Sequence, residues 1–138
     1  MSAMSPSRAA MTYASALNRN ELFESPGLRR DIPQLLRDDD EVLLVLPGVA
    51  GDFPDVVVVT TDRLLLAKVA GPLKRSAIRR EVPASQVTAV HYRPGVFSRI
   101  RFEVAGERDL RMMPHRKADA ERFAGEFSHL IATGRLPT

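Results

Sequence analysis

The stretch from Asp55 to Val69 constrains the fold more than any other part of the chain. It holds two apolar, β-prone runs, separated at Thr60 to Arg63 by residues that suit a tight turn. Neither run alternates cleanly between apolar and polar residues. A strand with one face in water shows that alternation, so both faces of this hairpin are expected to be covered, as in a small barrel or sandwich.

The surrounding sequence continues as short strands. We predict them over 41–47, 55–61, 63–69, 77–83, 86–93, 97–104 and 107–113. Glycine or proline lies at most of the boundaries between them. In the sixth strand, Ile100 and Phe102 point one way while Arg99 and Arg101 point the other, which indicates a sheet with one face in the core. Regularly spaced strands of this length predict a sandwich or a barrel.

A long amphipathic helix is predicted from about Arg116 to Thr133. Its apolar stripe contains Phe123 and Phe127, and Gly134 is a suitable stop. Seven strands would form a barrel with one open end, which this helix would fill with its phenylalanines.

The N-terminal region carries a weaker helical pattern. Tyr13 and Leu17 share a thin apolar face within residues 1–27, which predicts a loosely docked helix or a mobile arm. A short helix is expected to follow, beginning at Asp31 and running through Leu35 and Leu36 to the acidic residues Asp38 to Asp40. The predicted organisation is an arm over 1–27, a single domain over 28–134 and a tail over 135–138.

Composition excludes several classes of function. The chain has 138 residues and no cysteine, so disulfides, thiol catalysis and zinc–thiolate sites are ruled out. No catalytic motif is present, the three histidines lack metal-pair spacing, and the run from Asp38 to Glu41 lacks the pattern of a calcium loop and is interpreted as a solvated helix end. We therefore expect no enzymatic activity, no cofactor and no metal. The apolar runs are too short to span a membrane. The absence of cysteine suits a reducing cytoplasm, and the excess of arginine over lysine suits a bacterial source, so we expect a bacterial protein of the cytoplasm, with peripheral membrane association as a further option.

Three segments carry a family resemblance. Asp40 to Leu43, Val59 to Leu66 and Glu81 to Val90, in that order, resemble bacterial pleckstrin-homology (PH)-like domains of the group that includes the YokE-like and GRAM-related families. The resemblance implies a mainly β fold with flanking helices: a seven-stranded, partly open barrel of two nearly orthogonal antiparallel sheets with a C-terminal α-helix. It also implies a non-enzymatic module that binds anionic lipids or proteins, or that self-associates. The loop over 47–54 contains no cation, so the usual phosphoinositide site of the eukaryotic family members does not carry over.

Positive charge is concentrated in the middle of the chain. Residues 1–61 carry a net charge of −4 and residues 62–117 a net charge of +8. The first candidate anion site consists of five cations around a turn: Lys68, Lys74, Arg75, Arg79 and Arg80. The alternative is a solvated loop whose charges protect an edge strand from aggregation.

A second candidate anion site lies where the C-terminal helix begins. Arg116 and Lys117 oppose the helix dipole there, and a bound anion would remove the conflict. The alternative is a helix that begins slightly later.

Arginines also project from the predicted outer face of the last two strands. A turn at 105–107 would set Arg101 opposite Arg111, with Glu103 and Asp109 within reach, so ordinary surface pairing is expected. No aromatic residue alternates with these arginines, which argues against nucleic acid. Phe53 and Phe97 are expected at loop tips, folded back over the barrel or inserted into a partner.

The function favoured by these observations is a binding or assembly module that contacts a protein partner or another copy of itself. The alternative is peripheral binding of anionic lipid or another phosphate-bearing ligand through the basic 68–80 segment.

Overall fold

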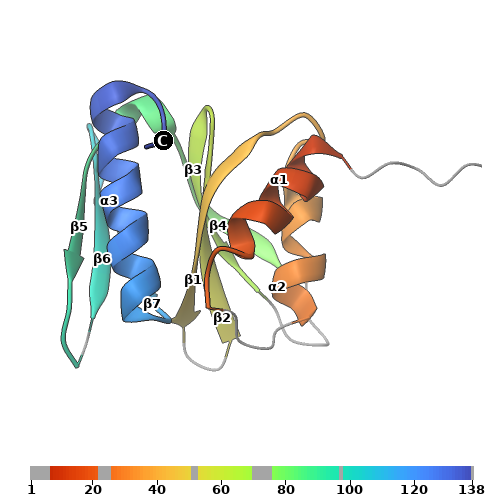
Figure 1. Cartoon of the computed structure of the whole chain (residues 1–138), viewed down its shortest axis with the longest axis horizontal. Coiled ribbons are helices and arrows are strands. Elements are labelled where there is room, and N and C mark those ends of the chain that lie inside the picture. The colour runs from red at the N-terminus through yellow and green to blue at the C-terminus, as the bar shows by residue number, and fades with distance from the viewer. Residues whose placement is uncertain (1–6, 22–25, 51–52, 70–75, 97, 138) are drawn as a thin grey trace, which may run out of the picture.

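The computed structural model describes residues 7–21, 26–50, 53–69, 76–96 and 98–137. Seven antiparallel strands lie in the order β4-β3-β2-β1-β7-β6-β5 (Figure 1). Their bounds are Val42–Ala50 (β1), Phe53–Thr60 (β2), Arg63–Lys68 (β3), Ala77–Pro83 (β4), Val87–Arg93 (β5), Arg99–Val104 (β6) and Leu110–Pro114 (β7). The predicted set of seven strands is confirmed.

Helices flank these strands on two sides. Their bounds are Arg8–Leu17 (α1), Pro26–Arg30 (α2) and Lys117–Thr133 (α3), with short 3-10 helices at Ile32–Leu35 (η1) and Ala84–Gln86 (η2). Sequence analysis missed α2, because Pro26 and the following glycine were interpreted as a break, whereas proline also suits a first helical turn. The predicted stop of α3 is confirmed: Gly134 adopts a left-handed φ of 80° and its N–H bonds back to the helix.

The strands form one continuous seven-stranded sheet, which divides into two parts where β1 meets β7. We call β1–β4 the first sheet and β5–β7 the second sheet. β1 pairs with β2 along most of its length but with β7 at only two positions, Gly48 with Pro114 and Val49 with Met113. β4 and β5 are the two edges. A Cβ at Gly48 would lie 2.5 Å from the backbone oxygen of Met113, so this joint requires glycine.

The main core lies between the two sheets and α3. Alternate residues of both sheets point into it, and α3 packs against β1, β5 and β7. The ring of Phe102 meets that of Phe123 edge-on at 6.0 Å, and Phe123 meets Phe127 edge-on at 5.8 Å. The prediction that α3 fills the barrel with its phenylalanines is confirmed.

A second core covers the outer face of the first sheet. Val56, Val58 and Leu65 are fully buried there beneath Tyr13 and Leu17 of α1. This arrangement explains why β2 and β3 do not alternate: their other face packs in the main core. α1 is thus more closely packed than the loose docking that its thin stripe suggested. The division of the chain at residue 27 stays a prediction.

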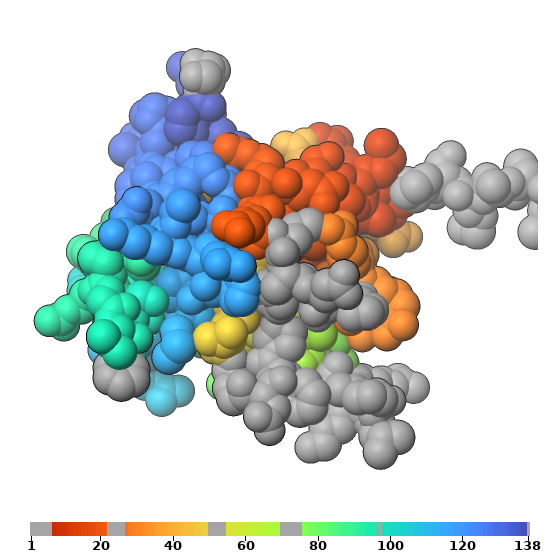
Figure 2. Space-filling model, turned by 60° about the horizontal axis from the view of Figure 1, so that its bottom comes forward, coloured from red at the N-terminus to blue at the C-terminus, as the bar shows by residue number. Residues whose placement is uncertain are grey.

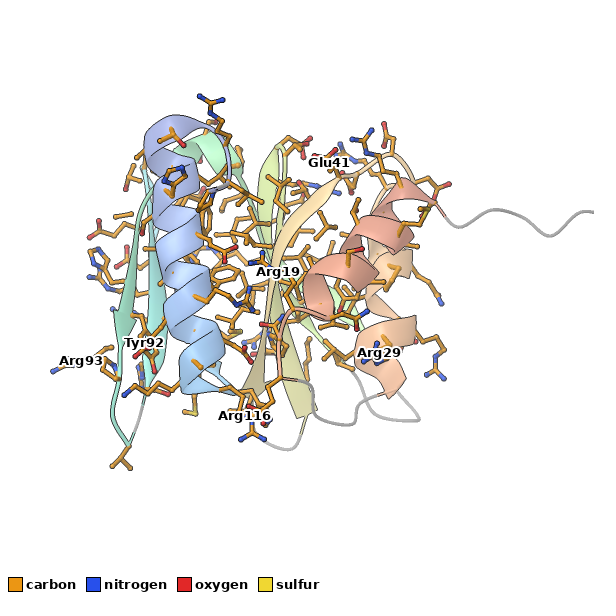
Figure 3. All side chains as sticks on the ribbon, in the orientation of Figure 1. Arg19, Arg29, Glu41, Tyr92, Arg93 and Arg116 are labelled. Atoms are coloured by element: carbon orange, nitrogen blue, oxygen red, sulfur yellow. The ribbon has the colours of Figure 1, made fainter. Side chains whose placement is uncertain are left out.

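The segment after α1 also joins the N-terminal helices to α3. The Arg19 guanidinium donates two hydrogen bonds to the Glu126 carboxylate, at 2.7 and 2.8 Å, and the Glu21 N–H donates to Asp119 at 2.9 Å. Figure 2 shows α1 (red) and α3 (blue) side by side on the surface, and Figure 3 shows Arg19 in the space between them. Several polar contacts therefore join the N-terminal segment to the C-terminal helix.

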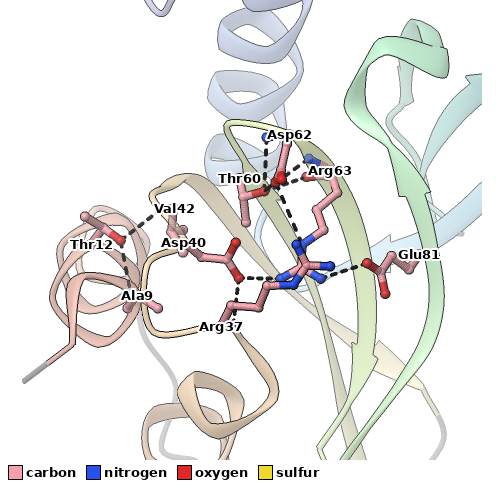
Figure 4. A network of polar contacts seen from close by, with 9 residues as sticks. All are labelled: Ala9, Thr12, Arg37, Asp40, Val42, Thr60, Asp62, Arg63 and Glu81. Atoms are coloured by element: carbon pink, nitrogen blue, oxygen red, sulfur yellow. Dashed lines mark hydrogen bonds and ion pairs between the residues drawn. The ribbon is translucent and has the colours of Figure 1, made fainter.

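A buried ion pair explains the Thr-Asp-Arg hairpin of the first sheet (Figure 4). Arg63 donates to Asp40 and, at 2.7 Å, to Glu81. The Thr60 hydroxyl accepts from the Arg63 N–H at 3.1 Å and closes the turn. The acidic run from Asp38 to Glu41 was interpreted as a solvated helix end, which is wrong for Asp40. Asp40 is only 6% exposed. Its carboxylate accepts a hydrogen bond from the Arg37 N–H at 2.8 Å and so stabilises the turn before β1.

Candidate anion-binding face

Cations gather on the outer face of the second sheet, which no helix covers in the described part of the chain. Strand register places His91, Arg101 and Arg111 in one row across β5, β6 and β7, and Arg93 beside Arg99 in another. We call these five residues the basic face. The inward neighbour Tyr92 packs against the main core, and Figure 3 shows Arg93 pointing away from the molecule.

Three of the four arginines on this face have no ion-pair partner among the described residues. Arg101 donates to Asp109 at 2.7 Å and to Glu103 at 3.3 Å, and these bonds, that to Asp109 first, raise its pKa above the ordinary value. Among the described residues no carboxylate forms an ion pair with Arg93, Arg99 or Arg111. Like charges directly opposite each other on a sheet destabilise it, typically by a few tenths of a kcal/mol. The arrangement therefore does not stabilise the fold, and a bound anion would offset the repulsion between these arginines.

The basic face is concave. A hollow of about 630 Å³ is lined by its five residues together with Pro94, Gly95 and Val96 of the β5–β6 loop. Val96 is 94% exposed, so a bare apolar side chain projects beside Arg93 and Arg99. An anion in this hollow would meet arginine forks that can each bind a carboxylate or phosphate through two hydrogen bonds.

Sequence analysis found part of this face. It placed Arg101 opposite Arg111 with Asp109 in reach, and the structure confirms that register. It missed His91 and Arg93 as members. The available signal was their spacing of two in β5, which brings them to the same side as Arg99 and Arg101 once β5 and β6 are paired.

The basic 68–80 segment is only partly described, because Lys74 and Arg75 lie outside the described residues. Arg79 donates to the buried Asp55 at 2.9 Å. Burial raises the pKa of Asp55, and the positive charges of Arg79 and Lys68 oppose that rise. Both cations therefore interact with this one carboxylate.

Phe53 and Phe97 were expected at the tips of loops. Their side chains lie outside the part of the chain that the structure describes.

Arg80 crosses from β4 to the turn before β7. It donates to the carbonyl oxygens of Arg108 and, at 2.9 Å, of Asp109, and so links the two sheets away from the β1–β7 joint. This contact occupies part of its guanidinium. Of the five predicted cations, the described three therefore each interact with groups of the chain itself.

The cations at the start of α3 also have carboxylates nearby. Arg116 lies 3.7 Å from Glu21, and Lys117 lies 3.9 Å from Glu121. Asp119 supplies an acid in the first turn, where the helix dipole favours it. Burial, reinforced by Arg116, lowers the pKa of His115 below its ordinary value.

The described residues contain no candidate metal-binding cluster and no candidate membrane-spanning helix. None of their His, Asp and Glu side chains gather in groups of three or more that could hold a metal ion. None of their helices has both the length and the apolar character needed to cross a bilayer.

Comparison with known proteins shows which solved structures this chain is similar to. The chain is similar to a pleckstrin homology domain from Shewanella amazonensis SB2B, with 18% identity over 73% of this chain and 98% of that one and a TM-score of 0.44. It is also similar to the N-terminally truncated linker-DH/PH domains of p115-RhoGEF, with 11% identity over 94% of this chain and 41% of that one and a TM-score of 0.53. No protein-family model matches the sequence, and comparison with curated proteins gives no match.

The fold is therefore PH-like, as predicted: mainly β, with seven antiparallel strands, a C-terminal helix and flanking N-terminal helices. Membership of the YokE-like or GRAM-related group stays a prediction.

Proposed function

We propose that the chain is a non-enzymatic binding module that docks a negatively charged partner on its basic face. A PH-like fold generally serves as a binding module for proteins or lipids, which supports the class. The observation that carries the proposal is that Arg93, Arg99 and Arg111 line one hollow and form no ion pair with any carboxylate that the structure describes. A partner protein is the leading candidate, and a location in the cytoplasm is part of the same hypothesis.

Self-association through this face is less well supported. The face carries one sign of charge, so a second copy would have to offer acidic side chains. Among the described acidic residues only Asp38 and Asp39 have no ion pair, and both lie together in one turn before β1. A different molecule is the better source of the complementary charge.

Solution NMR with the full chain and inorganic pyrophosphate as probe tests the proposal. We expect saturable amide shifts in β5, β6 and β7, lost in the double variant R99E/R111E and kept in R135E. Arg135 is an exposed cation at the far end of α3, so the control changes charge away from the basic face.

Three other outcomes would overturn the proposal. Saturable shifts confined to 68–80 would assign the anion site to the basic segment and favour phosphate-bearing ligands or anionic lipid there. Shifts confined to Arg116 and Lys117 would assign it to the start of α3. The absence of saturable shifts in any region would remove anion binding altogether.

A further inference from the structure

A second hollow adjoins the basic face. It has a volume of about 550 Å³ and is lined by Arg80, Arg108, Asp109 and Arg111. Arg111 lines both hollows, so the two are adjacent. Arg108, like Arg93, Arg99 and Arg111, forms no ion pair with a described carboxylate.

The two hollows follow the length of the second sheet. Val96 and Arg99 lie at one end of the β6–β7 hairpin, and Arg108 lies at the turn at the other end. β6 has 6 residues, so the track is roughly 20 Å long at about 3.3 Å per residue. A small anion such as a single phosphate would occupy one hollow and leave the arginines of the other unpaired.

Resting on the proposed function, we infer that the partner presents an extended acidic peptide segment, about six residues long, which lies along both hollows. Asp and Glu side chains of the peptide would pair with Arg99, Arg111 and Arg108 in turn, because an arginine guanidinium donates two parallel hydrogen bonds to a carboxylate. An apolar residue at one end of the segment would contact Val96, the bare side chain at the rim.

The lining of the track favours a peptide over the other extended polyanions. Single-stranded nucleic acid binds through stacking on aromatic side chains as well as through its phosphates. No aromatic residue lines either hollow among the described residues, and Tyr92 packs against the core instead. A flat bilayer that touched Val96 at one tip would leave Arg108 at the opposite end of the hairpin out of reach.

Fluorescence anisotropy with the full chain tests this inference. The probes are two fluorescein-labelled peptides, one of leucine followed by eight glutamates and one of leucine followed by three. We expect the longer peptide to bind at least tenfold more tightly. R111E should weaken the longer peptide at least tenfold, R99E should weaken both, and R108E should weaken the longer one alone. V96S should weaken both peptides but leave the affinity of a serine-led analogue unchanged.

R135E is the matched control, since it makes the same change of charge on an exposed arginine at the far end of α3. Circular dichroism establishes that each variant is folded. The inference is overturned if the two peptides bind equally, if R135E weakens binding as much as R111E, or if a dodecamer of deoxythymidine or vesicles of phosphatidylglycerol bind more tightly through the same arginines. Pyrophosphate shifts on the basic face without any dependence on peptide length would remove this inference and leave the proposed function standing.

Discussion

The two sheets of this molecule differ in what lies on their outer faces. In the first sheet, β1, β2 and β3 are mainly apolar on both sides, because α1 and the short helices after it cover the outer one, and the charged hairpin residue Arg63 is buried and paired. The second sheet is apolar only on its inner side and carries exposed arginines on the outer one. A strand in which apolar and polar residues do not alternate, such as β2, is thus covered on both faces, and a strand with clean alternation, such as β6, has one face exposed.

The largest expected effect comes from placing a charge on each outer face. Val58→Asp, beneath α1, should lower the free energy of unfolding by about 4 kcal/mol or more, since an unpaired carboxylate would be buried. Arg99→Asp, on the second sheet, should change it by less than about 1 kcal/mol. Urea unfolding followed by circular dichroism measures both. Similar losses for the two variants would contradict the comparison.

The next effect concerns the paired charge of the first sheet. Arg63→Ala leaves the buried Asp40 without its cation and should cost about 3–5 kcal/mol in urea unfolding. The double variant Asp40→Asn/Arg63→Met removes both charges and should recover part of that loss. A cost below about 1 kcal/mol for Arg63→Ala would show that the ion pair does not hold the hairpin.

The smallest effect tests the cover itself through its pH dependence. Burial raises the pKa of Tyr13 well above its ordinary value of 10.0, and its hydroxyl donates to the Leu28 carbonyl at 2.7 Å. A raised native pKa gives stability that is complete below pH 10 and is lost as the pH rises further, by up to about 1.4 kcal/mol per pH unit. Tyr13→Phe should lower the free energy of unfolding by about 1 kcal/mol at neutral pH, and it should reduce the further loss of stability at alkaline pH.

Thermal unfolding between pH 8 and 11 measures that difference. Equal pH dependence in the Tyr13→Phe variant and the unmodified chain would show that Tyr13 titrates freely, and so that α1 does not seal the outer face.

Most of the fold could be predicted because its signals are local. The apolar runs of β2 and β3, the alternation in β6 and the stripe with Phe123 and Phe127 each depend on neighbouring residues only. What covers the first sheet could not be predicted, since the apolar stripe of α1 is thin and the helix gains its burial only from tertiary contact.

The candidate site was harder to predict for a related reason. The 68–80 cations are close in sequence, yet Arg79 and Arg80 bond to Asp55 and to the carbonyls before β7, which only the fold brings near. The basic face has the opposite property. Its arginines are dispersed over three strands, and pairing of β5 with β6 and of β6 with β7 is what assembles them.

The close approach at Gly48 has a consequence for the whole molecule. The two sheets meet through a pair of residues on each side, at a place where even one methyl group would collide with the neighbouring main chain. The absence of a side chain at this one position therefore contributes to the angle between the two sheets, and so to the direction in which the arginine-lined surface faces.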